Sequence, residues 1–355
     1  MPSPEAAAEQ MALVQSNLAR IPATLNLKDA LAGQHLLLTG GTGFFGRWLL
    51  ALLASLNRQG AAIRVSVVSR HPARFLAQQP QYQGCSWLHW VVCDIRELGP
   101  VPGPPVELIL HAAAGTSAAA HSEPMELFNS IIGGAQRVLE LATRTGARRV
   151  LFTGSGAQYG TLPADHMVAE NFSGACASAS SASAYGEAKR AQETLGAIYA
   201  ERYGIDIILT RCFAFAGPGL PLDGHFAIGN FVRDALHADA IVLNSTGEAM
   251  RSYLHGADLA AWLLTLLTRG ESGQAYNVGS DQALSIGDLA RRVAAQIAPH
   301  KPVLIRGQGG GSLRSFYVPD ITRARALGLD VWTSLDESIC SMAEWARCAD
   351  GIRLD

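Results

Sequence analysis

A glycine-rich turn stands between a short apolar run and a helical stretch, and it limits the possible folds more than any other feature of the chain. Residues 35–39 (HLLLT) are too few for a helix and predict a buried strand, while residues 44–56 predict the helix that follows. Between them, Gly40, Gly43 and Gly46 have the spacing G-x-x-G-x-x-G. Gly40 permits a tight turn, Gly43 lets backbone N–H groups approach a pyrophosphate, and Gly46 lets the helix pack against the sheet. The sequence therefore predicts a helix N-terminus that faces an anion.

Short apolar strands alternate with helical stretches over most of the chain. Further strands are expected at 63–69, 87–93, 106–111, 150–153 and 205–210, with helices between them such as 125–145 and 184–203. This alternation predicts parallel strands joined by right-handed crossovers. The predicted fold class is α/β, a Rossmann-type doubly wound parallel sheet with a smaller C-terminal α/β substrate lobe.

The chain divides into three segments by sequence pattern. Residues 1–33 are an N-terminal extension, in which Met11, Leu13, Val14, Leu18 and Ile21 predict a short amphipathic helix that Pro22 ends. Residues 34–212 are expected to form the Rossmann domain. Residues 213–355 are expected to form mainly a substrate-binding lobe, with shorter elements at 230–237, 241–243, 256–267, 274–278 and 285–296, and the chain can return from it to the sheet.

Composition and charge exclude several classes of protein. Apolar residues make up 48% and charged residues 16%, which excludes disorder for most of the length. Lys and Arg number 28 against 30 for Asp and Glu, so we expect neither nucleic acid nor an anionic membrane as a partner. The longest apolar runs are shorter than the roughly 20 residues of a membrane span, and residues 1–10 show no secretory signal. The six cysteines form no C-x-x-C pair and the histidines no zinc pattern, so we expect reduced thiols, no metal and a cytoplasmic protein.

The ends of the later strands indicate how a dinucleotide would be held. Ser69 and Arg70 stand where a carboxylate would favour NAD, and Arg70 suits a 2′-phosphate, which favours NADP slightly, although it can equally be a solvated residue. Asp94 either accepts a hydrogen bond from the adenine amino group or serves as an ordinary cap. Residues 111–115 (HAAAG) offer a floor of small residues beneath the cofactor.

Tyr185 and Lys189 form Y-x-x-x-K, a spacing that places both side chains on one face of a helix. A phenol, with a pKa of about 10, is a poor base at neutral pH. A cationic Lys189 beside an oxidised nicotinamide would lower that pKa, so that Tyr185 can exchange a proton with a substrate hydroxyl or ketone. Ser155, at the end of another strand, can hydrogen-bond the same oxygen. The expected catalytic residues are thus Ser155, Tyr185 and Lys189.

These motifs resemble the extended short-chain dehydrogenases/reductases, in particular the NAD-dependent epimerase/dehydratase group that acts on nucleotide sugars. The resemblance covers about residues 34–330, and its marks are TGGTGFFG (39–46), HAAAG (111–115), TGSGAQYG (153–160), YGEAK (185–189), RCFAFAGPG (211–219), RSYLHGADLA (251–260), YNVGS (276–280) and LRSFYVPD (313–320). It implies the three catalytic roles above, a nucleotide-diphosphate sugar as substrate, and a homodimer. The implied substrate contacts are Thr116, Asn230, Arg251 and Arg314. The expected cofactor contacts are Gly40, Thr42, Gly43, Phe44, Phe45, Gly46, Ser69, Arg70, Asp94, Ile95, Ala112, Ala113, Tyr185 and Lys189.

Two positions depart from the family pattern. Sugar 4,6-dehydratases of this family carry an Asp-Glu pair just after the catalytic Ser or Thr, and UDP-glucuronate decarboxylases carry the Glu. Here those positions are Gly156 and Ala157. The favoured activity is therefore hydride transfer at a sugar carbon, by a nucleotide-sugar epimerase or a 4-ketoreductase. The alternatives are a 4,6-dehydratase with atypical acid/base residues, a short-chain dehydrogenase for a non-sugar alcohol, and a dinucleotide-sensing protein without catalysis.

Overall fold

A seven-stranded sheet forms the centre of the computed structural model, which describes residues 4–114, 122–224, 226–307 and 315–350. Its strand order is β11-β6-β5-β4-β1-β2-β3, and all neighbouring strands are parallel. The predicted doubly wound Rossmann-type sheet is confirmed. Its strands are β1 (His35–Thr39), β2 (Arg64–Ser69), β3 (Leu88–Val92), β4 (Leu108–His111), β5 (Arg149–Ser155), β6 (Asp206–Cys212) and β11 (Ala275–Val278).

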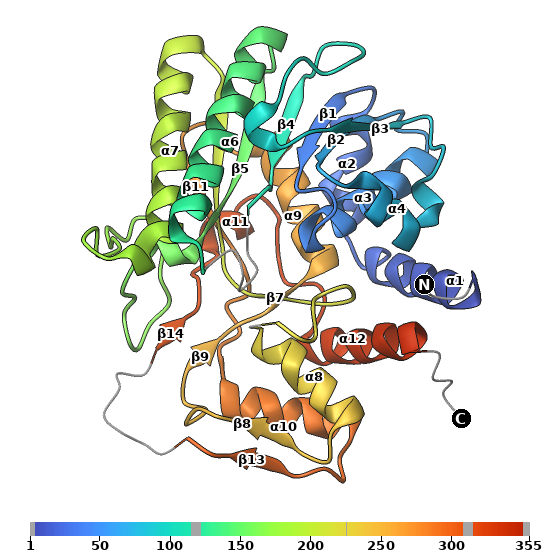
Figure 1. Cartoon of the computed structure of the whole chain (residues 1–355), viewed down its shortest axis with the longest axis vertical. Helices are drawn as coiled ribbons and strands as arrows, with labels where there is room; N and C mark the ends of the chain where they lie inside the picture. The colour runs from blue at the N-terminus through green and yellow to red at the C-terminus, as the bar shows by residue number, and fades with distance from the viewer. Residues whose placement is uncertain (1–3, 115–121, 225, 308–314, 351–355) are drawn as a thin grey trace.

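Helices cover both faces of this sheet (Figure 1). On one face, α3 (Phe44–Arg58) and α9 (Gly256–Arg269) share a core with Leu36 and Leu38 of β1. On the other, α6 (Pro124–Thr145) and α7 (Ala184–Tyr203) pack around Leu37. All five residues of β1 are buried, because a parallel strand between two helical layers has no solvent-facing side.

The strand order reverses beside β1, since β2 lies on one side of it and β4 on the other. The chain leaves the carboxyl ends of these strands toward opposite faces, which opens a crevice where ligands of such sheets bind. Thr39 and His111 pair in register at these ends, and the Thr39 hydroxyl lies 2.8 Å from Nδ1 of His111. The glycine turn follows Thr39 directly.

A smaller lobe carries the remaining elements, below the sheet in Figure 1. Its core joins α8 (Ala227–His237), α10 (Ile286–Ile297) and α12 (Leu335–Asp350) with the parallel pair β8 (Ile241–Leu243) and β13 (Val303–Ile305). A three-stranded sheet of β12 (Leu284–Ser285), β9 (Met250–Arg251) and β14 (Phe316–Tyr317), and the pair β7 (Phe215–Ala216) and β10 (Leu254–His255), complete it.

Two elements expected near this lobe belong to the large sheet instead. Helix α9 packs on α3, and β11 extends the sheet beside β6. All eleven residues from Ala257 to Leu267 of α9 are buried. A helix that is buried on every side belongs inside a core and not on the surface of a small lobe. The short helix α11 (Thr322–Arg325) then packs against β11.

The N-terminal extension forms α1 (Pro4–Leu18) and, after a short 3₁₀ turn, α2 (Leu27–Leu31). The predicted helix is present, but it begins at Pro4 and ends at Leu18, so Ile21 lies outside it and Pro22 does not end it. It packs on α12, α9 and α3 of its own chain. No helix within the described ranges is long and apolar enough to span a bilayer.

Candidate active site

The glycine turn brings the N-terminus of α3 against the end of β4. Gly40 has a φ of +71°, and a Cβ there would lie 2.6 Å from the carbonyl oxygen of Ala112. At Gly46 a Cβ would lie 2.2 Å from the carbonyl carbon of Gly41, so this glycine lets the first helical turn pack on the glycine turn itself. Both close approaches exclude any side chain.

Gly43 is different, because a Cβ there would meet only the carbonyl oxygen of Gly40, at 3.5 Å. It is the N-cap of α3 and no side chain caps the N–H groups of the first turn. Uncapped N–H groups beside open space suit a phosphate group. The turn therefore fits the pyrophosphate of a dinucleotide, with Thr42, Phe44 and Phe45 around it.

The end of β2 carries no carboxylate. Ser69 is half-buried and its hydroxyl accepts a hydrogen bond from the backbone N–H of His71 at 3.3 Å. Arg70 is exposed, and its charge lies close enough to Asp94 to lower the pKa of that carboxyl. This arrangement leaves the Arg70 guanidinium available for a phosphate.

Asp94 caps the short 3₁₀ turn Ile95–Glu97, accepting from the backbone N–H of Arg96 at 2.9 Å. The Arg96 guanidinium donates to both carboxylate oxygens, which is the main reason why the pKa of Asp94 is lowered. Asp94 therefore has the capping role that the sequence left open, while a contact with adenine stays a prediction. Ile95 packs against Gly134 of α6.

The end of β4 is fixed by the Thr39 hydroxyl, which accepts from the backbone N–H groups of both Ala112 and Ala113 at 3.1 Å. His111 is fully buried behind them, and burial lowers its pKa to about 3, so that it is neutral. The two alanines are half-buried. A small, rigid floor thus lies beside the glycine turn.

The end of β5 meets the start of α7 and brings Ser155 close to Tyr185 and Lys189. Tyr185 and Lys189 lie one turn apart at the start of α7. The Ser155 hydroxyl lies close enough to the Tyr185 phenol to lower the pKa of that phenol. The Lys189 ammonium is buried and donates to the carbonyl oxygen of Thr153 at 2.6 Å.

Burial dominates the protonation of this group. It raises the pKa of the Tyr185 phenol to about 12, while the Ser155 hydroxyl acts in the opposite direction. Burial also lowers the pKa of Lys189 to about 8. At neutral pH the phenol is therefore protonated. For Tyr185 to lose its proton, the charges of Lys189 and an oxidised nicotinamide would have to lower its pKa by more than burial raises it.

Tyr317 completes the group, although no role is predicted for it from the sequence motifs. It comes from β14 of the smaller lobe, and its hydroxyl donates to the carbonyl oxygen of Cys212 at 3.5 Å and lies close enough to Ser155 for that side chain to affect its pKa. A Cβ on Gly156 would lie 2.7 Å from this hydroxyl. The Tyr317 ring packs on Phe213, with 4.7 Å between centroids. A phenol therefore lies over the position where dehydratases of the family carry an acidic side chain.

Of the four expected substrate contacts, Arg251 lies beside this group. Its guanidinium stands over the Tyr317 ring at 5.6 Å and donates to the hydroxyl of Ser315 at 3.2 Å. Asn230 lies on α8, where its side-chain oxygen accepts from Arg233 at 3.3 Å. Thr116 and Arg314 lie outside the described residues.

Tyr317 could not be found from the chain because its role depends on a pairing between distant strands. β14 pairs with β9 so that Tyr317 lies opposite Arg251, 66 positions earlier. Near Tyr317 in the sequence, only the aromatic pair Phe316 and Tyr317 after Arg314 and Ser315 could have drawn attention to this segment. Among the described residues, no cluster of three or more His, Cys, Asp or Glu side chains is arranged to hold a metal ion.

A doubly wound sheet with a glycine turn at its crevice and a Ser-Tyr-Lys group at the end of β5 defines a dinucleotide-binding enzyme of the short-chain dehydrogenase/reductase type. The chain belongs to the NAD dependent epimerase/dehydratase family, whose model matches residues 36–279.

Relatives and solved structures agree with this assignment. UDP-glucuronic acid decarboxylase 6 of Arabidopsis thaliana is 27% identical over 329 residues, which cover 92% of this chain and 93% of the relative. The crystal structure of UDP-glucose 4-epimerase from Thermotoga maritima, with UDP-glucose, has a TM-score of 0.73 at 21% identity and covers 88% of this chain and 99% of its own. MoeE5 in complex with UDP-glucuronic acid and NAD has a TM-score of 0.71 at 24% identity, and the match covers 88% of this chain and 99% of MoeE5. At these identities the two structures support the fold.

Proposed function

We propose that this protein transfers a hydride at one carbon of a nucleotide-diphosphate sugar, as an epimerase or a ketoreductase, with Tyr185 as acid/base. The observation that carries the proposal is the position of the Ser155 hydroxyl and the Tyr185 phenol beside each other, on the elements that also hold the buried ammonium of Lys189. When bound, NAD or NADP would take the hydride from the sugar carbon and return it in an epimerase, and the reduced cofactor would supply the hydride in a ketoreductase. The glycine turn would hold its pyrophosphate, and Lys189 its ribose hydroxyls.

Each residue of this group has a separate task in the proposed chemistry. Tyr185 gives its phenolic proton to a sugar ketone or takes one from a sugar hydroxyl. Ser155 hydrogen-bonds the same sugar oxygen and holds the phenol in place. Lys189 is fixed by the Thr153 carbonyl, and its positive charge favours the phenolate whenever the phenol has lost its proton.

Gly156, Ala157 and Tyr317 favour this chemistry over elimination or decarboxylation. Neither Gly156 nor Ala157 can give or take a proton. The Tyr317 hydroxyl occupies the space beside Gly156, and burial raises the pKa of this phenol, so it stays protonated at neutral pH and cannot accept a proton. Removing a proton from a sugar carbon would need a group at this position that is deprotonated at neutral pH.

A diphosphate sugar is supported by Arg251. Its guanidinium lies over the Tyr317 ring, so the same side chain can contact a phosphate and border the sugar. The similarity over nearly the whole chain to a UDP-glucuronic acid decarboxylase makes UDP-glucuronic acid the first substrate to test. With no carboxylate at positions 156 and 157, we expect its carboxyl group to be retained.

The experiment is a panel of nucleotide sugars, 4-keto sugars among them, incubated with the purified protein and either the oxidised cofactors NAD and NADP or the reduced cofactors NADH and NADPH, with products identified by NMR. A change of configuration at one carbon, or reduction of a 4-keto sugar, supports the proposal. Release of CO₂ from UDP-glucuronic acid, or a 4-keto-6-deoxy product, would contradict it. Binding of cofactor without stabilisation by any nucleotide sugar in thermal unfolding would favour a non-sugar substrate or a sensor.

A further inference from the structure

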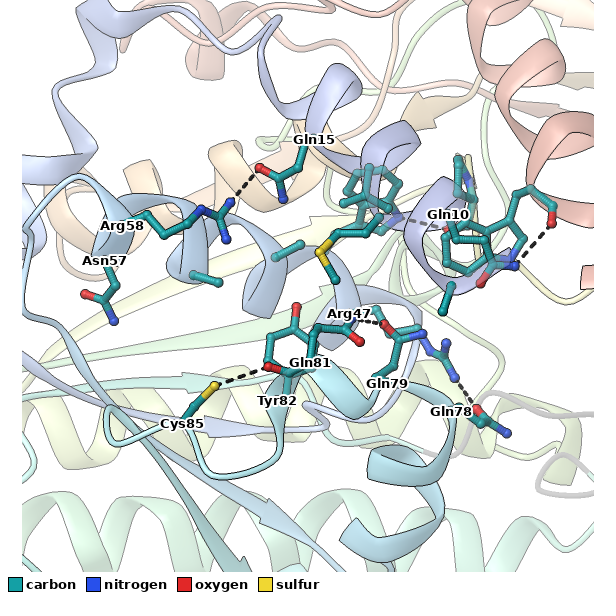
Figure 2. Close-up of a pocket in the computed structure, with 18 of the residues that line it drawn as sticks. Gln10, Gln15, Arg47, Asn57, Arg58, Gln78, Gln79, Gln81, Tyr82 and Cys85 are labelled. Atoms are coloured by element: carbon teal, nitrogen blue, oxygen red, sulfur yellow. Dashed lines mark hydrogen bonds between the residues drawn. The ribbon is translucent and has the colours of Figure 1, made fainter. Parts of the chain in front are cut away.

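A cavity of about 350 Å³ lies between the N-terminal helix α1, the outer side of α3 and residues 78–87 (Figure 2). Its lining includes Gln10 and Val14 of α1 and Trp345 of α12. These three residues lie outside 36–279, the part of the chain that the family model matches. The cavity is therefore built from the family core and from segments that the family model does not contain.

The sequence of α3 explains why the space is empty. Arg47, Ala51, Ala54 and Arg58 all line the cavity, and their spacings of four, three and four residues place them on one face of the helix. The two alanines leave the middle of this face hollow. The two arginines are separated by eleven residues, about 16 Å along the axis, and mark its ends.

Among the described residues, neither arginine has an acidic partner. In the part of the chain that the structure describes, no carboxylate lies within ion-pair distance of Arg47 or Arg58. Arg47 donates to the side-chain oxygen of Gln78 at 2.5 Å, and Arg58 to that of Gln15 at 2.6 Å. Figure 2 shows these two pairs on opposite sides of the cavity.

Arg47 is the more informative of the two because it is half-buried, and burial lowers its pKa. A guanidinium that has left water normally gains an anion in exchange. Gln78 offers only a neutral oxygen, so the site favours a ligand that brings a negative charge.

Aromatic side chains form much of the remaining wall. Tyr82, Trp87 and Trp345 line the cavity together with Val14, and Tyr82 is buried. Tyr82 is held in place by Phe75, whose ring stacks on it at 5.8 Å. Flat apolar walls with a few polar groups at the rim are typical of small-molecule sites of this size.

We infer that this cavity is a second ligand site, which binds a small molecule with a flat apolar body and an anionic group. The apolar body would lie over Ala51 and Ala54 against the aromatic wall. The anionic group would pair with Arg47, displacing the Gln78 amide, while Arg58 offers a second cation at the far end. The catalytic residues Ser155, Tyr185 and Lys189 take no part in this site.

The test uses anilinonaphthalene sulfonate, an anionic and aromatic dye whose emission rises in apolar surroundings. The dye is titrated into the full-length protein with saturating NAD and UDP, which block the cofactor and substrate crevice. Arg47→Gln removes the charge, and Ala54→Phe fills the hollow without touching either arginine. Arg148→Gln is the matched control, because Arg148 also donates to a glutamine oxygen, that of Gln34, but lies outside the cavity.

We expect saturable binding of one dye molecule per chain. Arg47→Gln should weaken it about tenfold, which is the loss of one charge-assisted hydrogen bond. Ala54→Phe should abolish it, and Arg148→Gln should leave it unchanged. The proposal is overturned if no saturable binding remains once the crevice is blocked, or if Arg47→Gln binds as tightly as the parent protein. The far-ultraviolet circular dichroism of each variant shows that it is folded, and Arg47→Gln alone decides the matter should Ala54→Phe fail to fold.

Discussion

Replacing Gly156 by alanine would place a methyl group against the Tyr317 hydroxyl. The new Cβ would lie 2.7 Å from this oxygen and 2.9 Å from two ring carbons of Phe213, which are distances that real Cβ atoms do not adopt. The two rings pack on each other, and Arg251 covers Tyr317, so neither can move alone. Overpacking of this kind costs about 1–3 kcal/mol. We expect the free energy of unfolding to fall by this amount in a urea titration.

A double-mutant cycle separates this contact from other effects. Tyr317→Phe removes the oxygen and its hydrogen bond to the Cys212 carbonyl, at a cost of about 1 kcal/mol. In the Gly156→Ala/Tyr317→Phe protein the shortest contact is gone, so the combined loss should be smaller than the sum by at least about 0.5 kcal/mol. Gly99→Ala is the control, since a Cβ there meets nothing within 4 Å and should change stability by less than about 0.5 kcal/mol.

The cycle can also refute the reasoning. If Gly156→Ala is as stable as Gly99→Ala, the Tyr317 hydroxyl does not lie over Gly156 in solution. If the two losses simply add, the residues do not touch. Either result would remove the packing argument against an acidic side chain at position 156.

Three further predictions address the two ligands and the core. Arg251→Ala should raise the KM for the nucleotide sugar about tenfold and leave cofactor affinity within twofold, and unchanged binding of UDP in calorimetry would remove its role at the diphosphate. Arg70→Ala should weaken NADP about tenfold and NAD less than twofold in fluorescence titrations, because only NADP carries the 2′-phosphate; an equal loss for both would show that Arg70 does not read it. Burial raises the pKa of Asp258 to about 6, although the backbone N–H groups of Thr333 and Trp332 donate to its carboxylate. The folded state therefore favours the neutral carboxyl group, and the free energy of unfolding should fall as the pH rises from about 4 to about 6, by up to about 3 kcal/mol. Asp258→Asn should flatten that part of the stability profile, and an unchanged slope would contradict the prediction.

The sheet was predictable from the sequence because each element carries its own local pattern. β1 and α7 begin and end at the predicted residues, 35–39 and 184–203. The placement of α9 was not predictable in the same way, because its run of apolar residues says that it is buried but not against which layer. The same holds for β11, whose place beside β6 depends on a crossover from the smaller lobe.

The site was predictable only where its residues lie in contiguous motifs. The spacing of Tyr185 and Lys189 follows from the geometry of one helix, and Ser155 from the end of one strand. Tyr317 reaches Ser155 through the pairing of β14 with β9, and the cavity beside α3 needs α1 to pack on both α3 and α12. Contacts between segments so far apart leave no periodic signal in a single sequence.

The most direct test of the proposed function compares Tyr185→Phe with the parent protein on the nucleotide sugar that the substrate panel identifies. The ring stays and only the phenolic oxygen and its proton are lost, so the dissociation constant of the cofactor should change less than about twofold. Turnover should fall by a factor of about 10²–10⁴, the usual contribution of a general acid/base. Turnover near that of the parent protein, with the cofactor still bound, would contradict the role of Tyr185 and with it the proposed chemistry.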